Sequence, residues 1–176
     1  MQDLIKLRKN RKYTVVLYNP NYVEQFEAYS KKIQNIFNDP SIKIEHIGST
    51  AVIGMCGKPC IDILVMTENL GVVENHIQDM EKCGFEYAGS FVMDNSILFR
   101  LMKDGESFVN VHFFPIDHPH NKEMLDIRDY LISHPEEVKI YSNLKNQLFS
   151  KYPNDYNAYR KYKDEHMRGL MKKSRI

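Results

Sequence analysis

The stretch IEHIGSTAVIGMCGKPCIDILV, residues 44–65, combines the residue types that phosphate and metal chemistry requires. Gly48, Ser49 and Thr50 follow a short apolar run, and a turn of this composition presents backbone N–H groups and a hydroxyl to phosphate oxygens. Asp62 lies among isoleucine, leucine and valine, where a carboxylate is costly unless a metal ion or several donors offset its charge. The stretch therefore predicts a turn that binds phosphate beside an aspartate that holds a divalent metal ion. The alternative is a structural aspartate that accepts backbone hydrogen bonds at a strand edge.

Polar residues also interrupt two apolar runs farther along the chain. Arg100, in ILFRLM, requires an anionic partner if both faces of its strand are covered, and that partner is either Asp62 or a phosphate. His112, in VNVHFF, is either a core histidine or a group that orients or deprotonates a hydroxyl. Lys58, in the loop before Asp62, either clamps a phosphate or is solvated. If Asp62, Arg100 and His112 share one face of a small sheet, they form a pocket.

The residues around the turn leave two further alternatives. Glu45 and His46 are consecutive in a predicted strand, so at most one of them points into the site. A zinc site made of Cys56, Cys60 and His46 is conceivable, but C-x3-C without a second pair favours small apolar thiols packed in a loop. Three cysteines are an odd number, which argues against a disulfide framework.

Hydrophobic periodicity predicts the elements that must position these residues. A helix should follow Asn19-Pro20-Asn21, and a second should run through ENLGVVENHIQDMEKC and end at Gly84. Strands are expected in SIKIEHI and CIDILVM, and a hairpin should join SILFRLM to SFVNVHFF through Asp104-Gly105. From Pro119 onward the pattern is helical. This order predicts a mixed α/β (α+β) fold, in which a mixed sheet of four to six strands packs with helices and a helical C-terminal segment follows.

Length, composition and charge are those of an ordinary globular protein. The 176 residues, 43% hydrophobic and 27% charged, predict a single domain 1–176, with the sheet core at about 1–116 and the helical part at about 117–176. No window reaches the length of a membrane span and the N-terminus lacks a signal-peptide block, so we expect a cytoplasmic protein without a membrane partner. Residues 151–176 carry eight Lys or Arg against three acids, which favours a solvated helix face over a nucleic-acid partner. The sequence leaves the oligomeric state open.

Spacing and motif order together resemble a known family. Twelve residues separate Ser49 from Asp62, an arrangement similar to the signature of the nucleotidyltransferase (polymerase-β-like) superfamily. The block 44–65 resembles the hallmark of the GrpB family, His-Ile-Gly-Ser-Thr-Ala-Val followed by Lys-Pro and a strand with a single Asp. The agreement continues in order through YNPNYVEQFE, GFEY, VNVHFF, IRDYLISHPEEVKIYSNLKNQL and AYRKYKDEHM, and it covers about 13–172.

The resemblance implies a nucleotidyltransferase-like fold, and some relatives are fused to a coenzyme A biosynthetic kinase. In the wider superfamily the strand carries two acids, two residues apart, and a later strand carries a third. Here Leu64 stands at the second position, and the later strand presents Asn110, His112 and Phe114. Two-metal phosphoryl transfer requires more oxygen ligands than Asp62 supplies, so the acidic metal site is incomplete and catalysis stays an open question.

Two functions follow as expectations from the resemblance. The first is Mg²⁺-dependent transfer of a nucleotidyl group from a nucleoside triphosphate to an unknown acceptor, with Asp62 as metal ligand and Asp62 and His112 as catalytic residues. The residues expected to bind nucleotide or phosphate are Gly48, Ser49, Thr50, Lys58 and Arg100. The second function is a non-catalytic module that binds a nucleotide or a coenzyme A-like phosphorylated metabolite. Arg128, Lys145 and Lys163 match family positions, where they either line the site or cover helix surfaces.

Overall fold

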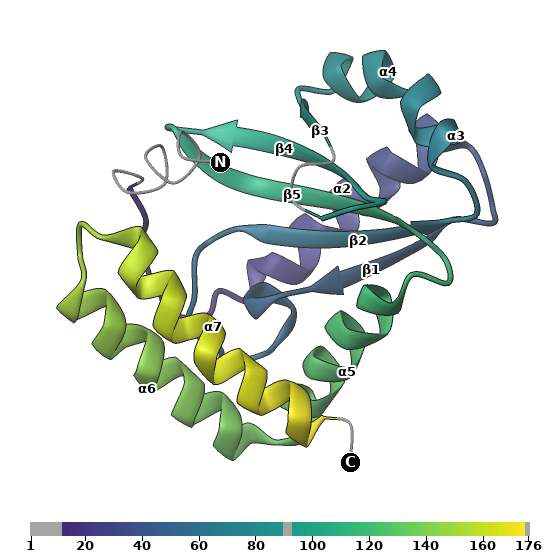
Figure 1. Ribbon diagram of the computed structural model, residues 1–176. Helices are drawn as coiled ribbons and strands as arrows, with labels where there is room; N and C mark the ends of the chain where they lie inside the picture. Colours follow the sequence, from purple (N-terminus) through teal and green to yellow (C-terminus); the bar gives the residue numbers. More distant parts are fainter. Residues whose placement is uncertain (1–11, 90–92, 175–176) are drawn as a thin grey trace. The chain divides into compact units, whose positions relative to one another are not determined.

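The computed structural model describes residues 12–89 and 93–174, which form two compact units (Figure 1). Within these ranges the sheet unit comprises 19–51 and 60–125, and the helical unit comprises 12–18, 52–59 and 126–174. One division between the two units falls at 125–126, inside the helix Pro119–Ser133. The expected domain 1–176 also includes residues 1–11, 90–92 and 175–176, which lie outside the described ranges, so this expectation stays a prediction.

The sheet unit contains a five-stranded mixed sheet in its described residues, which confirms the predicted fold class. The strands are β1 (Lys43–Ile47), β2 (Ile61–Thr67), β3 (Glu86–Gly89), β4 (Ile97–Lys103) and β5 (Glu106–Pro115). Their order is β1-β2-β5-β4-β3, with β2 and β5 parallel and the other neighbours antiparallel. The centre of the sheet is therefore β2 beside β5, the two strands that carry Asp62 and His112.

One face of this sheet packs on the helix α2 (Asn21–Phe37), which crosses it in Figure 1. Phe37 of α2 lies against Phe113 of β5, with 5.2 Å between ring centroids, and Phe99 of β4 packs edge-on against the same ring. Residues of β2 alternate between the two faces, and Ile61, Ile63 and Val65 are fully buried. This face belongs to the core, and Asp62, Asn110 and His112 lie on the opposite face.

The predicted crossover helix between β2 and β3 is two short helices, α3 (Leu70–Asn75) and α4 (Ile77–Lys82). The break lies at His76, whose N–H donates to the carbonyl of Val73 instead of continuing the α-helical pattern. The Nδ1 atom of His76 contacts the carbonyl of Val72 at 2.9 Å. In a continuous α-helix this carbonyl would accept from the backbone N–H of His76, so the side chain takes the place of that backbone bond. The segment ends at Gly84, which has a φ of 89°, as the sequence predicts.

The helical unit consists mainly of α6 (Pro135–Lys151) and α7 (Tyr156–Lys173), which lie side by side (Figure 1), and of the second half of α5 (Pro119–Ser133). The Asp155 side chain caps α7 by accepting a hydrogen bond from the N–H of Ala158. Burial raises the pKa of the Tyr141 hydroxyl on α6 and of the Tyr159 hydroxyl on α7. Tyrosine packing therefore builds this core. Within the described residues no helix has the length and apolar character that a membrane span needs.

Candidate functional site

The Gly48–Thr50 turn and Asp62 lie in direct contact. β1 ends at Ile47, and Gly48 follows with a φ of 75°, a conformation that only glycine adopts without strain. A Cβ atom added to Gly48 would lie 2.6 Å from Oδ2 of Asp62, so the carboxylate fills the space that a side chain would occupy. Gly48 is exposed and Ser49 is half-buried, so the backbone of the turn beside this carboxylate is accessible. The turn and the aspartate thus form one site, although twelve residues separate Ser49 from Asp62 in the chain.

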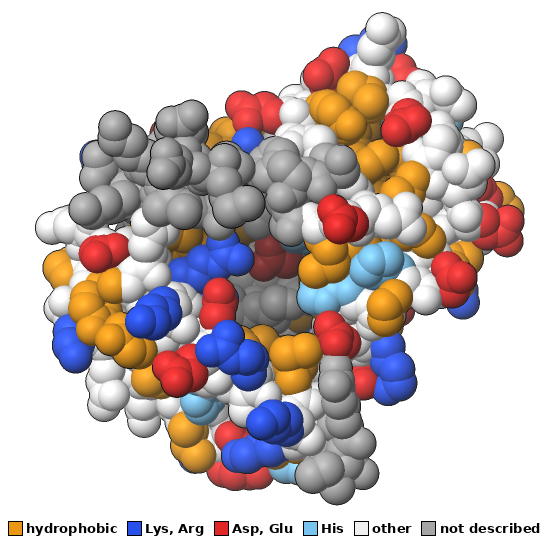
Figure 2. Space-filling model, viewed as in Figure 1, with side chains coloured by type: hydrophobic (Ala, Val, Ile, Leu, Met, Phe, Trp, Pro, Cys, Tyr) orange, Lys and Arg blue, Asp and Glu red, His pale blue; other side chains and the backbone are white. Residues whose placement is uncertain are grey.

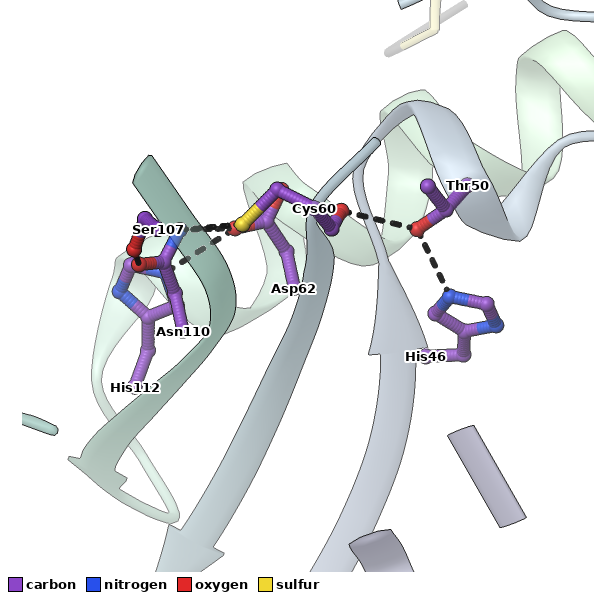
Figure 3. A network of polar contacts seen from close by, with 7 residues as sticks. All are labelled: His46, Thr50, Cys60, Asp62, Ser107, Asn110 and His112. Carbon is purple, nitrogen blue, oxygen red and sulfur yellow. Dashed lines mark hydrogen bonds and ion pairs between the residues drawn. The ribbon is translucent and has the colours of Figure 1, made fainter. Parts of the chain in front are cut away.

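Asn110 of β5 fixes the position of the Asp62 side chain (Figure 3). Its Nδ2 atom donates to Oδ1 of Asp62 at 2.7 Å and to the Sγ atom of Cys60 at 3.2 Å. The Ser107 hydroxyl donates to Oδ1 of Asn110 at 2.5 Å, which sets the orientation of the amide. Asp62 therefore faces a hydrogen-bond donor, and not a carboxylate, at the opposite position of β5.

Strand register places Asp62, Arg100 and His112 on one face of the sheet. Asp62 is opposite Asn110, and Asn110 is opposite Arg100, so the three residues form a row across β2, β5 and β4. His112 lies in the next row, and its Nε2 atom is 3.7 Å from Oδ1 of Asp62. The side chains of Asp62 and His112 are 29% and 23% exposed, so both are reachable by a ligand. This arrangement can bind a cation at the carboxylate and a hydroxyl group at the imidazole.

Arg100 has a partner that the sequence did not suggest. Its Nη2 atom lies 4.0 Å from Oε2 of Glu86, which is opposite Arg100 on the neighbouring strand β3. Expected partners were Asp62 or a phosphate, and Glu86 replaces Asp62 because β3 pairs with β4 at the edge of the sheet. The Nε atom of Arg100 is buried and has no hydrogen-bond partner among the described residues. The guanidinium therefore keeps donor capacity on the site face.

His46 and Glu45 lie on opposite faces of β1, which settles which of them points toward the site. Glu45 is opposite Leu64 and shares the face of Asp62. His46 stacks on Phe26 of α2, with 4.5 Å between ring centroids and parallel planes, on the other face. Thr50 is 1% exposed, and its hydroxyl contacts His46 and the Cys60 carbonyl, so the side chain holds the turn and does not face a ligand. The expectation that Thr50 binds phosphate is thus limited to its backbone.

The conceivable zinc site is not assembled. No group of three His, Cys, Asp or Glu residues within 12–89 and 93–174 is placed to hold a metal ion. Cys60 lies in the sheet unit, where Asn110 donates to its thiol, and His46 contacts Thr50. Cys56 belongs to the helical unit, where Asn146 donates to its thiol at 3.7 Å and Lys145 donates to its carbonyl at 2.7 Å. Each thiol is packed against an amide, as expected of small buried side chains.

The remaining predicted cations belong to the helical unit. Lys58 lies over the ring of Tyr156, with 5.6 Å from Nζ to the centroid. Lys145 is buried, 3% exposed, and holds the loop 52–59 through Cys56. Arg128 pairs with Asp129 at 2.8 Å and Lys163 pairs with Asp164 at 3.3 Å. Figure 2 shows basic and acidic side chains interspersed over the C-terminal helices, so the local charge excess forms no uniform basic patch on this face.

Related proteins align with most of the length of this chain. The family model described as GrpB protein matches residues 12–173. UPF0157 protein YqkA of Bacillus subtilis is 32% identical over 166 residues, which are 93% of this chain and 47% of YqkA, so the chain spans about half the length of that relative. Glutamate-rich protein GrpB of Alkalihalophilus pseudofirmus is 30% identical over 82% of this chain and 86% of its own length.

Solved structures agree with this relationship. The conserved protein GrpB from Enterococcus faecalis matches with a TM-score of 0.85 and 31% identity, over 92% of this chain and 96% of that one. The Cid1 poly(U) polymerase matches with a TM-score of 0.53 and 12% identity, over 85% of this chain and 45% of that one, and this likeness concerns the fold alone. Motifs, family model and structural matches together show that the chain belongs to the GrpB family and has a nucleotidyltransferase-like fold.

Proposed function

We propose that the protein binds a nucleoside triphosphate together with Mg²⁺ and transfers a nucleotidyl group to a small acceptor. The observation that carries this proposal is the contact between the Asp62 carboxylate and the Gly48 backbone, where an added Cβ would be 2.6 Å from Oδ2. Phosphate oxygens that accept hydrogen bonds from the turn would then lie beside a carboxylate, which repels them unless a cation lies between. The nucleotidyltransferase-like fold supports the same reading.

The residues present fit one Mg²⁺ ion and do not fit a pair. Mg²⁺ is commonly held by one or two carboxylates, the phosphates of the substrate and several waters, so Asp62 suffices as a protein ligand. The second acidic position is Leu64, which is fully buried, and the residue of β5 opposite Asp62 is Asn110, whose Nδ2 atom points at Asp62. Asp62 would hold the ion, and a bound Mg²⁺ supplies positive charge between phosphate oxygens.

The neighbouring side chains supply the other roles. Ser49 and the backbone of the turn bind phosphate, and Arg100 adds guanidinium donors from β4. His112 would accept the proton of the acceptor hydroxyl, because its imidazole is accessible on the site face 3.7 Å from Asp62, and the hydroxyl oxygen would then displace pyrophosphate from the α-phosphate. The chemistry thus divides between a turn that holds the phosphates and a face of the sheet that holds the cation and the acceptor.

Binding without transfer is the second candidate function, and Asn110 is the observation that favours it. A donor amide, and not a second carboxylate, lies opposite Asp62, and the Ser107 hydroxyl keeps the amide oriented toward Asp62. One carboxylate fixes a cation less firmly than three do. The site is therefore suited to binding a nucleotide or a coenzyme A-like phosphate at least as well as to stabilising the transition state of nucleotidyl transfer. Such a module would retain its ligand without consuming it.

Replacing Asn110 with aspartate tests whether a cation lies at Asp62. Two carboxylates would then face each other across β2 and β5, and we expect a loss of about 1–3 kcal/mol in the free energy of unfolding without Mg²⁺. Millimolar Mg²⁺ should restore the stability of Asn110→Asp and leave the wild type nearly unchanged in the absence of nucleotide. Urea unfolding with Mg²⁺ and with chelator measures the difference, and Asn110→Leu is the control that removes the donor without adding charge. Equal stability of Asn110→Asp in both buffers would contradict a cation position at Asp62.

A thermal-shift panel tests the proposed function itself. Nucleoside triphosphates and coenzyme A precursors are each added with and without Mg²⁺, and a true ligand at about 100 times its Kd should raise the Tm by roughly 5–10 °C. Ligands that bind are then incubated with an α-³²P label and candidate acceptors. Transfer of label supports the first function, and Mg²⁺-dependent binding without transfer supports the second. No shift with any phosphorylated ligand would contradict both.

A further inference from the structure

Cys60 joins the two halves of the site described above. Its carbonyl accepts a hydrogen bond from the hydroxyl of Thr50 at 3.3 Å, and its thiol accepts one from Nδ2 of Asn110 at 3.2 Å. The same Nδ2 atom donates to Asp62 at 2.7 Å. Figure 3 shows the resulting continuous path from His46 through Thr50, Cys60 and Asn110 to Asp62. The turn and the carboxylate are therefore linked through side chains as well as through the backbone.

The donor at each step of this path can be assigned. The Cys60 carbonyl is only an acceptor, so the single hydroxyl proton of Thr50 must point to it. The Thr50 oxygen then accepts from Nε2 of His46, which lies 3.0 Å away. His46 must carry a proton on Nε2, and its ring is held in plane by Phe26, with 3° between the two rings. Both the neutral Nε2–H tautomer and the cation donate to Thr50, whereas the Nδ1–H tautomer would accept from the Thr50 hydroxyl and leave the Cys60 carbonyl without that donor.

The backbone of the turn is held by a long hydrogen bond. Residues Ser49–Ala51 form a single 3-10 turn, and its backbone bond, from the N–H of Ala51 to the carbonyl of Gly48, is long at 3.3 Å. Thr50 lies at the middle of this turn and is 1% exposed, so its hydroxyl hydrogen-bonds to protein groups and not to bulk water. The hydrogen bonds of the Thr50 side chain therefore determine the orientation of the peptide units around Ser49.

We propose that His46 and Thr50 are positioning residues that hold the Gly48–Thr50 turn in register with Asp62. His46 acts from the opposite face of the sheet, so it touches no ligand, and Thr50 touches none with its side chain. The consequence for nucleotide binding rests on the proposed function, and the hydrogen-bonded path itself does not. Removing one bond of the path should loosen the turn while Asp62 and the strands stay in place.

Two matched pairs of variants test the proposal in the full chain. His46→Phe keeps the stack on Phe26 and removes the donor, and His46→Gln keeps an Nε2–H donor. Thr50→Val removes the hydroxyl at similar size, and Thr50→Ser retains it. We expect His46→Phe and Thr50→Val each to raise the Kd for Mg²⁺-ATP about 3- to 10-fold by isothermal titration, as the loss of one or two hydrogen bonds does. His46→Gln and Thr50→Ser should stay within about twofold of the wild type.

The double variant shows whether the two residues act through one path. His46→Phe combined with Thr50→Val should weaken binding no more than Thr50→Val alone, because both single changes break the same bond. A double variant whose fold-change is the product of the two single ones would overturn the proposal. So would a His46→Gln variant as weak as His46→Phe, since the ring and not the donor would then matter.

Nuclear magnetic resonance of the ligand-free protein gives a reading that needs no nucleotide. Long-range ¹H–¹⁵N correlation of the His46 ring should show Nε2 protonated, and the side-chain amide signals of Asn110 should move in Thr50→Val and stay in place in Thr50→Ser. Two results would contradict the hydrogen-bonded path: a His46 ring protonated on Nδ1 alone, or Asn110 side-chain amide shifts that are the same in Thr50→Val as in the wild type. If the wild type fails to bind Mg²⁺-ATP, the proposed function fails, and these signals alone decide the positioning role.

Discussion

Asp62→Asn abolishes the Mg²⁺-dependent part of nucleotide binding and leaves the protein folded. In the wild type, Nδ2 of Asn110 donates to Oδ1 of Asp62 at 2.7 Å, and asparagine at position 62 retains an Oδ1 atom that can accept this bond. The substitution removes the negative charge that a cation requires. We expect the Kd for Mg²⁺-ATP to rise about a hundredfold, the loss that follows when a charge-paired group is truncated to its neutral analogue. Titration calorimetry in Mg²⁺ and in chelator measures it, with Asp104→Asn in the exposed β4–β5 turn as the matched control.

Unfolding of the same variant distinguishes a ligand role from a structural one. A structural carboxylate in a buried pair would cost about 3–5 kcal/mol when it is neutralised, a fall in Tm of roughly 6–20 °C for a chain of this size. The Asp62 side chain is 29% exposed, and solvent screening reduces any such cost. We therefore expect the Tm of Asp62→Asn without ligand to lie close to that of the wild type. A Tm lowered by more than about 6 °C, with nucleotide binding retained, would make Asp62 structural.

Gly48→Ala displaces the Asp62 carboxylate and destabilises the turn. A Cβ at this position would lie 2.6 Å from Oδ2 and 3.3 Å from Cγ of Asp62, so the side chain must rotate away from the turn. The φ of 75° adds backbone strain of about 1–2 kcal/mol for a residue other than glycine. Since both halves of the site move apart, we expect Mg²⁺-ATP binding to weaken by at least about tenfold together with a Tm fall of roughly 2–8 °C.

Gly105→Ala is the control that isolates the strain. Gly105 has a φ of 79° in the β4–β5 hairpin and nothing within 4 Å of an added Cβ. It should show a similar fall in Tm with nucleotide binding unchanged. If Gly48→Ala binds Mg²⁺-ATP as tightly as Gly105→Ala does, the contact between the turn and Asp62 plays no part in ligand binding.

The sheet was predicted from strand periodicity together with the family resemblance. Strand alternation determines which side chains of one strand share a face, so Asp62, His112 and Arg100 could be grouped only on the condition that strand pairing places them on one face. Asp104-Gly105 indicated the hairpin because its turn chemistry is local. These features depend on neighbours two to four residues apart, and such neighbours are visible in the sequence.

Other features depend on pairing that no local pattern contains. Glu86 became the partner of Arg100 because β3 lies at the edge next to β4. Thr50 looked like a phosphate ligand within its motif, but its side chain turns inward to Cys60 because β2 begins there. His76 divides a helix that periodicity predicted as continuous, since its ring binds the carbonyl of Val72. From the sequence, Asn110 was recognised only as part of a strand face without a carboxylate. Its hydrogen bond to Asp62 depends on the parallel pairing of β2 with β5, which no local pattern contains.

A direct titration of the wild-type protein with ATP tests the central claim, that the turn and Asp62 together form a Mg²⁺-dependent nucleotide site. Isothermal titration calorimetry is run with Mg²⁺ and repeated with the metal chelated. The account predicts saturable binding near one ATP per chain with Mg²⁺, weakened at least about tenfold by chelation. Absence of binding in both buffers, or an isotherm that chelation leaves unchanged, would contradict it.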